Sequence, residues 1–136
     1  MNTIKFFVPG KPQGKARART FYNPRLGRSI SMTPDNTVLY ENLIKECCMN
    51  NMSEEQKKHD DQAALTLYIT ALYAPVKSTS KKQRERMLRD EILPTKKPDI
   101  DNIVKVVADA LNGVAYRDDT QIVKIIAEKH YSDIEG

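Results

Sequence analysis

The sequence predicts a small α/β (α+β) fold, in which helices pack on a mixed β-sheet in the element order β-α-β-α-α-β. Residues 63–74 alternate apolar and polar side chains, as a strand with one buried face does. Residues 101–113 repeat apolar side chains at helical spacing and form one buried stripe. A chain of 136 residues is large enough for a hydrophobic core, and we expect residues 1–136 to form a single domain.

The first third of the chain is expected to contain one strand and one helix. Residues 4–8 are mainly apolar and alternate in part, which predicts the first strand. Proline and glycine within residues 9–14 end this strand and open an irregular loop. In that loop Phe21 and Tyr22 are either available for stacking on a nucleic-acid base or part of the core.

A helix is predicted from Thr33 as N-cap, with Pro34 in its first turn, to about Met49. Its apolar face is followed by a polar loop at residues 50–61. The alternating strand at residues 63–74 then ends at Pro75.

Two further helices and a last strand complete the predicted order. Residues 81–89 form a short, very basic helix with few apolar side chains. The helix at residues 101–113 ends at Asn112–Gly113, because glycine suits the left-handed conformation of a helix C-terminus. Residues 122–131 are apolar on one face and predict the last strand.

Charge is distributed unevenly along the chain. The net charge is +4, but residues 1–31 contain seven Lys or Arg and no acid, so the remainder sums to 4 − 7 = −3. If extended, the alternating residues Lys15, Arg17 and Arg19 project from one side about 6–7 Å apart, close to the phosphate spacing of one DNA strand. A basic arm joined to carboxylates is expected of a protein that binds a polyanion; a solvated basic face is the alternative.

Composition also predicts the cellular compartment of the protein. No apolar stretch approaches the ~20 residues of a membrane span, and residues 1–3 do not resemble a secretion signal. Cys47 and Cys48 are adjacent within a predicted helix and suit a reducing compartment. We therefore expect a cytoplasmic protein with no membrane partner, and the absence of a glycine-rich phosphate loop argues against an organic cofactor.

Acidic residues cluster in the stretch 97–121. Asp99 and Asp101 precede the helix, and Asp118–Asp119 precede the last strand. The ordinary interpretation is an N-cap and a turn. However, a cap needs only one carboxylate, and neither Asp99 nor Asp101 is followed by the Glu or Gln of a capping box. Because a helix followed by a returning strand can bring both pairs together, the stretch predicts a site for a hard divalent cation.

Lys105 lies one helical turn beyond Asp101 and on the same face of the predicted helix. It can stabilise charge on a scissile phosphate, or it can form an i,i+4 ion pair with Asp101 or Asp109. Asp109 itself is expected to be a surface or helix-supporting residue.

Three motifs together resemble the RusA family of Holliday-junction resolvases of bacteria and prophages. They are Lys-Pro-Asp-Ile-Asp-Asn-Ile-Val-Lys at 97–105, Asp-Ala-Leu-Asn-Gly at 109–113 and Asp-Asp-Thr-Gln-Ile at 118–122. The basic Gly-Lys-Pro-Gln-Gly-Lys-Ala-Arg at 10–17 is also similar to that family's N-terminal signature, although Ala16 and Ala18 stand where a proline can occur. The resemblance extends almost from end to end.

The resemblance implies a homodimer that cleaves four-way junction DNA with Mg²⁺, which Mn²⁺ can replace. It also implies roles for residues at matching positions: Asp99, Asp101 and Asp119 as metal-binding catalytic acids and Lys105 as the essential lysine. Asp118 is expected to assist or to shape the turn, and Asn102 to orient a ligand or cap the helix. The residues expected to contact DNA are Lys11, Lys15, Arg17, Arg19, Lys81 and Lys82.

Two other functions fit the same sequence. One is a protein that binds branched DNA without cutting it. The other is a Mg²⁺-dependent nuclease for flaps or other branched DNA.

Overall fold

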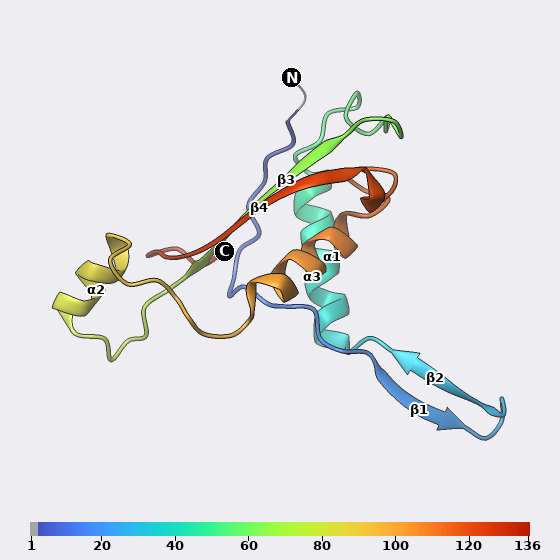
Figure 1. The fold of residues 1–136 in the computed structure, drawn as a ribbon, viewed down its shortest axis with the longest axis horizontal. Helices are drawn as coiled ribbons and strands as arrows, with labels where there is room; N and C mark the ends of the chain where they lie inside the picture. The colour runs from blue at the N-terminus through green and yellow to red at the C-terminus, as the bar shows by residue number, and fades with distance from the viewer. Residues whose placement is uncertain (1–2) are drawn as a thin grey trace.

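The computed structural model describes residues 3–136 and confirms the α/β class (Figure 1). The helices are α1 (Asp35–Met49), α2 (Lys81–Leu88), α3 (Ile100–Leu111) and the short 3-10 helix η1 (Asp119–Gln121). The strands are β1 (Arg19–Asn23), β2 (Arg28–Met32), β3 (Leu65–Tyr73) and β4 (Ile122–Tyr131). They form two two-stranded sheets: an antiparallel hairpin of β1 and β2, and a parallel pair of β3 and β4. None of the helices in residues 3–136 is long and apolar enough to cross a membrane.

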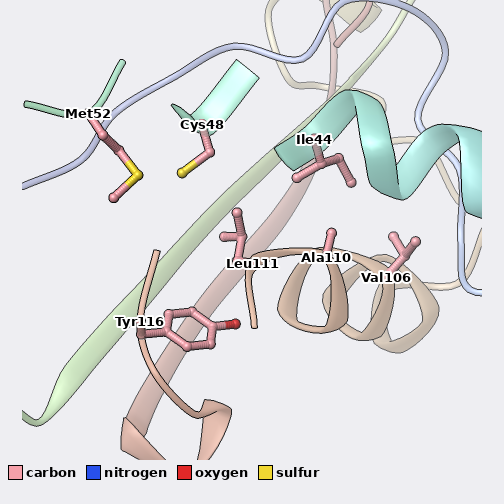
Figure 2. Close-up of a cluster of buried hydrophobic side chains, with 7 residues drawn as sticks. All are labelled: Ile44, Cys48, Met52, Val106, Ala110, Leu111 and Tyr116. Carbon is pink, nitrogen blue, oxygen red and sulfur yellow. The ribbon is translucent and has the colours of Figure 1, made fainter. Parts of the chain in front are cut away.

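The main core lies where α1 packs against α3 beside the β3–β4 pair (Figure 2). Its buried side chains are Ile44, Cys48, Met52, Val106, Ala110, Leu111 and Tyr116. Burial raises the pKa of the Cys48 thiol to about 11, so this cysteine stays protonated and behaves as an apolar core residue. The predicted apolar stripe of α3 is confirmed, because its buried residues are the ones that contact α1 and the sheet.

The predicted strand at residues 63–74 is confirmed as β3. Its side chains alternate in exposure over most of its length, and Thr66, Tyr68 and Thr70 face solvent. The second core cluster joins Ala71 and Tyr73 near the end of β3 to Ile103 of α3. This packing fixes the start of α3 against the sheet.

The predicted strand at residues 4–8 is wrong, because this segment belongs to neither sheet in the structure. Its side chains nevertheless alternate as expected: Ile4, Phe6 and Val8 are half-buried against the main core. An alternating pattern reports which side chains are buried, and it does not guarantee a neighbouring strand for the backbone.

The β1–β2 hairpin replaces the predicted irregular loop. Its turn is encoded locally: the N–H of Arg25 donates to Asn23 Oδ1 at 3.0 Å, and the N–H of Gly27 donates to the Asn23 carbonyl at 2.9 Å. Gly27 has a φ of 63°, which glycine adopts without strain. Asparagine followed by proline and then by glycine between two alternating runs is a turn signal that the sequence prediction missed.

Helix boundaries differ slightly from the predicted ones. The N-cap of α1 is Pro34 rather than Thr33, and no side chain caps this end. The stop after α3 is confirmed, because Gly113 has a φ of 78°.

Candidate functional site

Asp99 and Asp101 stand at the start of α3 with free carboxylates. Asp99 occupies the N-cap position, but its side chain makes no capping hydrogen bond. Asp101 lies in the first turn, and both residues are exposed. Within residues 3–136, neither carboxylate takes part in an ion pair. The ordinary capping role is therefore not realised, and both groups are available to a ligand.

The segment that leads into Asp99 is held against the ends of the parallel strands. Lys129 of β4 donates to the carbonyl of Lys96 at 2.6 Å. The ammonium groups of Lys96 and Lys129 also lie 5.7 and 5.4 Å from the centre of the buried Tyr73 ring, a cation–π arrangement. These contacts fix the direction from which the chain enters α3.

The basic loop packs directly on the acidic start of α3. The N–H of Lys15 donates to the Asn102 carbonyl at 2.9 Å. A methyl group added at Gly14 would lie 2.9 Å from the Cβ atoms of Pro98 and Asn102, so glycine permits this close approach. Loop and helix together line a hollow of about 610 Å³ that contains Lys11 and Asp99. Cationic and anionic side chains thus share one concave surface.

Lys15 does not project with Arg17 as the alternating pattern predicts. Its ammonium nitrogen lies 2.5 Å from Glu41 Oε1 of α1 and 3.3 Å from Asp109 Oδ2 of α3. Burial disfavours the charged form, but the hydrogen bonds from Glu41 and Asp109 outweigh it and raise the pKa of Lys15. Lys15 ties the loop to two helices, and its charge is already neutralised.

The Asp118–Asp119 pair divides into a structural and a free acid. Asp118 caps η1: its Oδ1 accepts the N–H of Thr120 at 3.1 Å, which lowers the pKa of Asp118. Gln121 completes the cap, because its Oε1 accepts the N–H groups of Arg117 and Asp118, both at 3.1 Å. Of the two roles predicted for Asp118, shaping the turn is therefore the one seen.

Asp119 is exposed at the start of η1. A hydrogen bond with the Asp118 carboxyl group raises the pKa of Asp119, and the negative charge of Asp109 adds to this effect. Asp109, whose charge acts on Asp119, follows Asp101 by eight residues, or about 12 Å of helix. In the part of the chain that the structure describes, no three acidic, His or Cys side chains come close enough to hold one metal ion. The predicted convergence of Asp99, Asp101 and Asp119 is not present in this structure.

Lys105 is exposed on α3, one turn beyond Asp101. The ion pair with Asp101 or Asp109 that its spacing allows does not form in residues 3–136; Asp109 pairs with Lys15 instead. The Lys105 ammonium group is therefore free to meet an anionic ligand.

Comparison with known proteins assigns the chain to a family. The family model described as Endodeoxyribonuclease RusA matches residues 9–136. The chain belongs to the RusA family. It is also 31% identical over 139 residues to the uncharacterized protein YqaN of Bacillus subtilis (strain 168), covering 98% of this chain and 91% of YqaN. No solved structure matches.

Membership of the RusA family makes this chain an endodeoxyribonuclease of the Holliday-junction class. RusA nucleases are generally dependent on a divalent metal. The donor chemistry of this chain fits such an ion, because free carboxylate oxygens are the ligands that hard divalent cations prefer.

The remaining basic residues of this RusA chain occupy two separate places. Lys11, Arg17 and Arg19 are exposed along the loop and the first residue of β1. Lys81 and Lys82 are exposed at the start of α2, which lies on the other side of the molecule from the hairpin (Figure 1). A DNA molecule that contacted both groups would have to extend across the molecule.

Sequence reasoning missed Glu41 and Gln121 and underrated Asp109. Glu41 gave no signal, because its partner is 26 residues away and on another element. The spacing of Asp109 on α3 indicated an ion pair with Lys105, whereas its partner in the structure is Lys15 of the basic loop. Gln121 is buried, and its amide donates to the carbonyls of Asp60 and Ala63 at 2.7 and 3.1 Å.

Proposed function

We propose that this RusA-family nuclease uses Mg²⁺ to resolve Holliday junctions as a homodimer, with residues 1–136 acting as one endonuclease domain. The observation that carries the proposal is the hollow in which the basic loop packs on the acidic start of α3. A metal-dependent nuclease has to attract the phosphate backbone and hold a cation close to the scissile phosphate.

Asp99, Asp101 and Asp119 are the residues proposed to hold the metal. Two of them lie together at the start of α3, and Asp119 is the acid of its pair that the turn does not use. A bound divalent ion neutralises charge on the phosphoryl oxygens and activates a water molecule. Because Asp99, Asp101 and Asp119 do not form one ligand cluster among residues 3–136, we expect η1 to shift toward the start of α3 when the site is loaded.

Lys105 is proposed to contact the scissile phosphate. Its ammonium is a compact point charge with three donors, which suits a phosphate oxygen whose charge increases in the transition state. Lys11 lines the hollow, and the exposed Arg17 follows the last loop residue that lines it; both are proposed to position the neighbouring phosphates. Asn102 anchors the loop through its carbonyl, and a ligand-orienting role for its side chain stays a prediction.

Substituting the acids tests the metal site. Asp101→Asn and Asp119→Asn are expected to slow junction cleavage by roughly 100-fold or more, since a bound ion stabilises the transition state by several kcal/mol. Junction binding is expected to persist or tighten, because each change removes negative charge beside the phosphates. Asp35→Asn is the matched control, since Asp35 is an acid in the first turn of α1. A variant that cuts at the wild-type rate in Mg²⁺ would remove that acid from the mechanism.

The substrate is tested with a mobile four-way junction, a flap and a linear duplex, each with Mg²⁺ and with EDTA. Paired cuts in the junction that require Mg²⁺ are expected. Preferred cleavage of the flap would instead make the chain a nuclease for other branched DNA. Binding of the junction without cutting would indicate a protein that recognises branched DNA only.

A further inference from the structure

The β1–β2 hairpin extends away from the body of the molecule beyond the start of α1 (Figure 1). Its two strands pack mainly on each other. A two-stranded hairpin on its own is only marginally stable in water. An arm that is ordered by its own turn and little else is well placed to contact a partner.

The hairpin exposes several large apolar side chains, among them two aromatic rings. Tyr22 is 63% exposed, Phe21 47%, Met32 54% and the turn residue Leu26 55%. The sequence left open whether Phe21 and Tyr22 are core residues or available for stacking, and the structure places both on the surface. Neither aromatic ring belongs to a core cluster.

The strand register distributes these side chains over two faces. Phe21 lies opposite Ile30, with the Arg19–Met32 and Asn23–Arg28 pairs on either side along the same face. Tyr22 lies on the other face opposite Ser29. The first face borders a hollow of about 500 Å³ between the hairpin and the start of α1, lined by Arg19, Phe21 and Met32 from the hairpin.

Charge indicates the kind of partner. Residues 19–32 contain Arg19, Arg25 and Arg28 and no acid, so the arm is cationic throughout. Arginine with exposed aromatic rings suits nucleic acid, because the guanidinium groups pair with phosphates while the rings stack on bases. A linear duplex hides the faces of its bases within the stack, whereas a branch point exposes some of them.

We infer that the β1–β2 hairpin is a DNA-binding arm that contacts the branch point, with Phe21 and Tyr22 stacking on bases exposed there and the three arginines on the surrounding phosphates. This inference rests on the proposed function, because it takes branched DNA as the substrate. It assigns recognition of branched structure to the arm and cleavage to the acidic start of α3.

The test measures binding of a four-way junction and of a linear duplex in EDTA by fluorescence anisotropy. Tyr22→Ala and Phe21→Ala are each expected to weaken junction binding by roughly 5- to 150-fold, as loss of one stacked base does. Duplex binding is expected to stay unchanged. Tyr22→Phe is expected to retain wild-type affinity, because it keeps the ring. Tyr68→Ala is the matched control, since Tyr68 is an equally exposed strand tyrosine (71%) on the body of the protein.

Tyr22 also protects the test against misfolding. It lies on the face opposite the Phe21–Ile30 pair, so its truncation leaves that cross-strand contact intact. If Phe21→Ala unfolds the arm, the junction affinity of Tyr22→Ala tests the inference. A 2-aminopurine base at the branch point gives a second readout, because its fluorescence falls when an aromatic ring stacks on it and is expected to recover in Tyr22→Ala.

Three outcomes would overturn the inference. One is wild-type junction affinity in both alanine variants. Another is an equal loss of affinity for junction and duplex, which would leave no preference for the branch point. The third is conversion of a dimer into a monomer with DNA affinity retained, which would make the arm an interface between two copies of this chain. Binding measured in EDTA does not depend on cutting. If the wild-type protein binds the junction through the hairpin but does not cleave it in Mg²⁺, the proposed function is wrong while the inference about the arm holds.

Discussion

At the scale of single residues, two lysines that the sequence analysis assigned to phosphate contacts have different electrostatic surroundings. Lys15 is held between Glu41 and Asp109, and its side chain is only 19% exposed. Lys105 is exposed, and no acid in residues 3–136 pairs with it. An ammonium group that is already paired with acids adds little to phosphate binding, because it neutralises little phosphate charge and therefore releases few counterions from the DNA.

Lys15→Ala is therefore expected to act on stability rather than on DNA affinity. It leaves two acids without their cation, and the free energy of unfolding is expected to fall by about 1–3 kcal/mol. The slope of log binding constant against log salt is expected to stay at the wild-type value. Arg17→Ala is the matched control, and its slope is expected to flatten by about 0.9, because one fewer phosphate is neutralised. A slope that flattens equally in both variants would restore Lys15 as a phosphate-binding residue.

At the scale of elements, η1 depends on one buried side chain. Gln121 joins the backbone of residues 117–118 to the carbonyls of Asp60 and Ala63, and so positions Asp119. Gln121→Ala leaves these buried groups without partners and is expected to cost about 1–3 kcal/mol of unfolding free energy. Cleavage is expected to fall as well, because Asp119 loses its support. Gln62→Ala is the matched control, since Gln62 is an exposed glutamine of the neighbouring loop. A normal cleavage rate in a destabilised Gln121→Ala protein would show that η1 does not position the site.

The end of α2 is joined to β4 through a histidine. His130 Nδ1 lies 2.9 Å from Asp90 Oδ1 just after α2, and Nε2 lies 3.2 Å from Glu128 Oε2. These hydrogen bonds, chiefly the one with Asp90, raise the pKa of His130 above its ordinary value. The folded protein thus holds the proton more tightly than the unfolded chain.

The stabilisation from protonated His130 is complete below the unfolded pKa, about 6.5, and is lost as the pH rises through the higher folded value. Melting temperature is expected to fall by a few °C at most over that interval, because the pair is largely exposed. His130→Gln is expected to abolish this part of the pH dependence, as measured by thermal melts in matched buffers. An unaltered pH profile in His130→Gln would show that the histidine does not stabilise the folded state through its charge.

Elements also show what a single sequence can and cannot predict. The α3 stripe, β3 and the stop at Gly113 were predictable, because each depends on local periodicity or on one backbone angle. The partnership of Lys15 with Glu41 was not, because it depends on how α1 crosses α3. Likewise, the pattern at residues 4–8 predicts burial correctly but cannot say whether another strand lies beside it.

At the scale of the whole molecule, the basic loop that packs on the acidic start of α3 gives each copy of the chain one hollow in which cationic and anionic side chains lie together. One active site can cut one strand at a time, whereas resolving a junction takes two cuts. Two copies related by a two-fold axis would present two such sites to the two-fold symmetric arms of a junction. Light scattering at working concentration is expected to give the mass of a dimer.

Mixed dimers test this requirement directly. When Asp101→Asn protein is allowed to exchange subunits with wild-type protein, a mixed dimer retains one cutting site. It is expected to nick a junction and leave the opposite strand intact, so nicked junctions accumulate as the fraction of variant rises. A gel that separates nicked junctions from linear duplex products measures the amounts of nicked and of resolved junction. The matched mixture with Asp35→Asn is expected to resolve junctions normally. Resolution could instead stay proportional to the fraction of wild-type protein in the mixture, with no nicked product. Each copy would then make both cuts by itself, and the paired-site mechanism would be wrong.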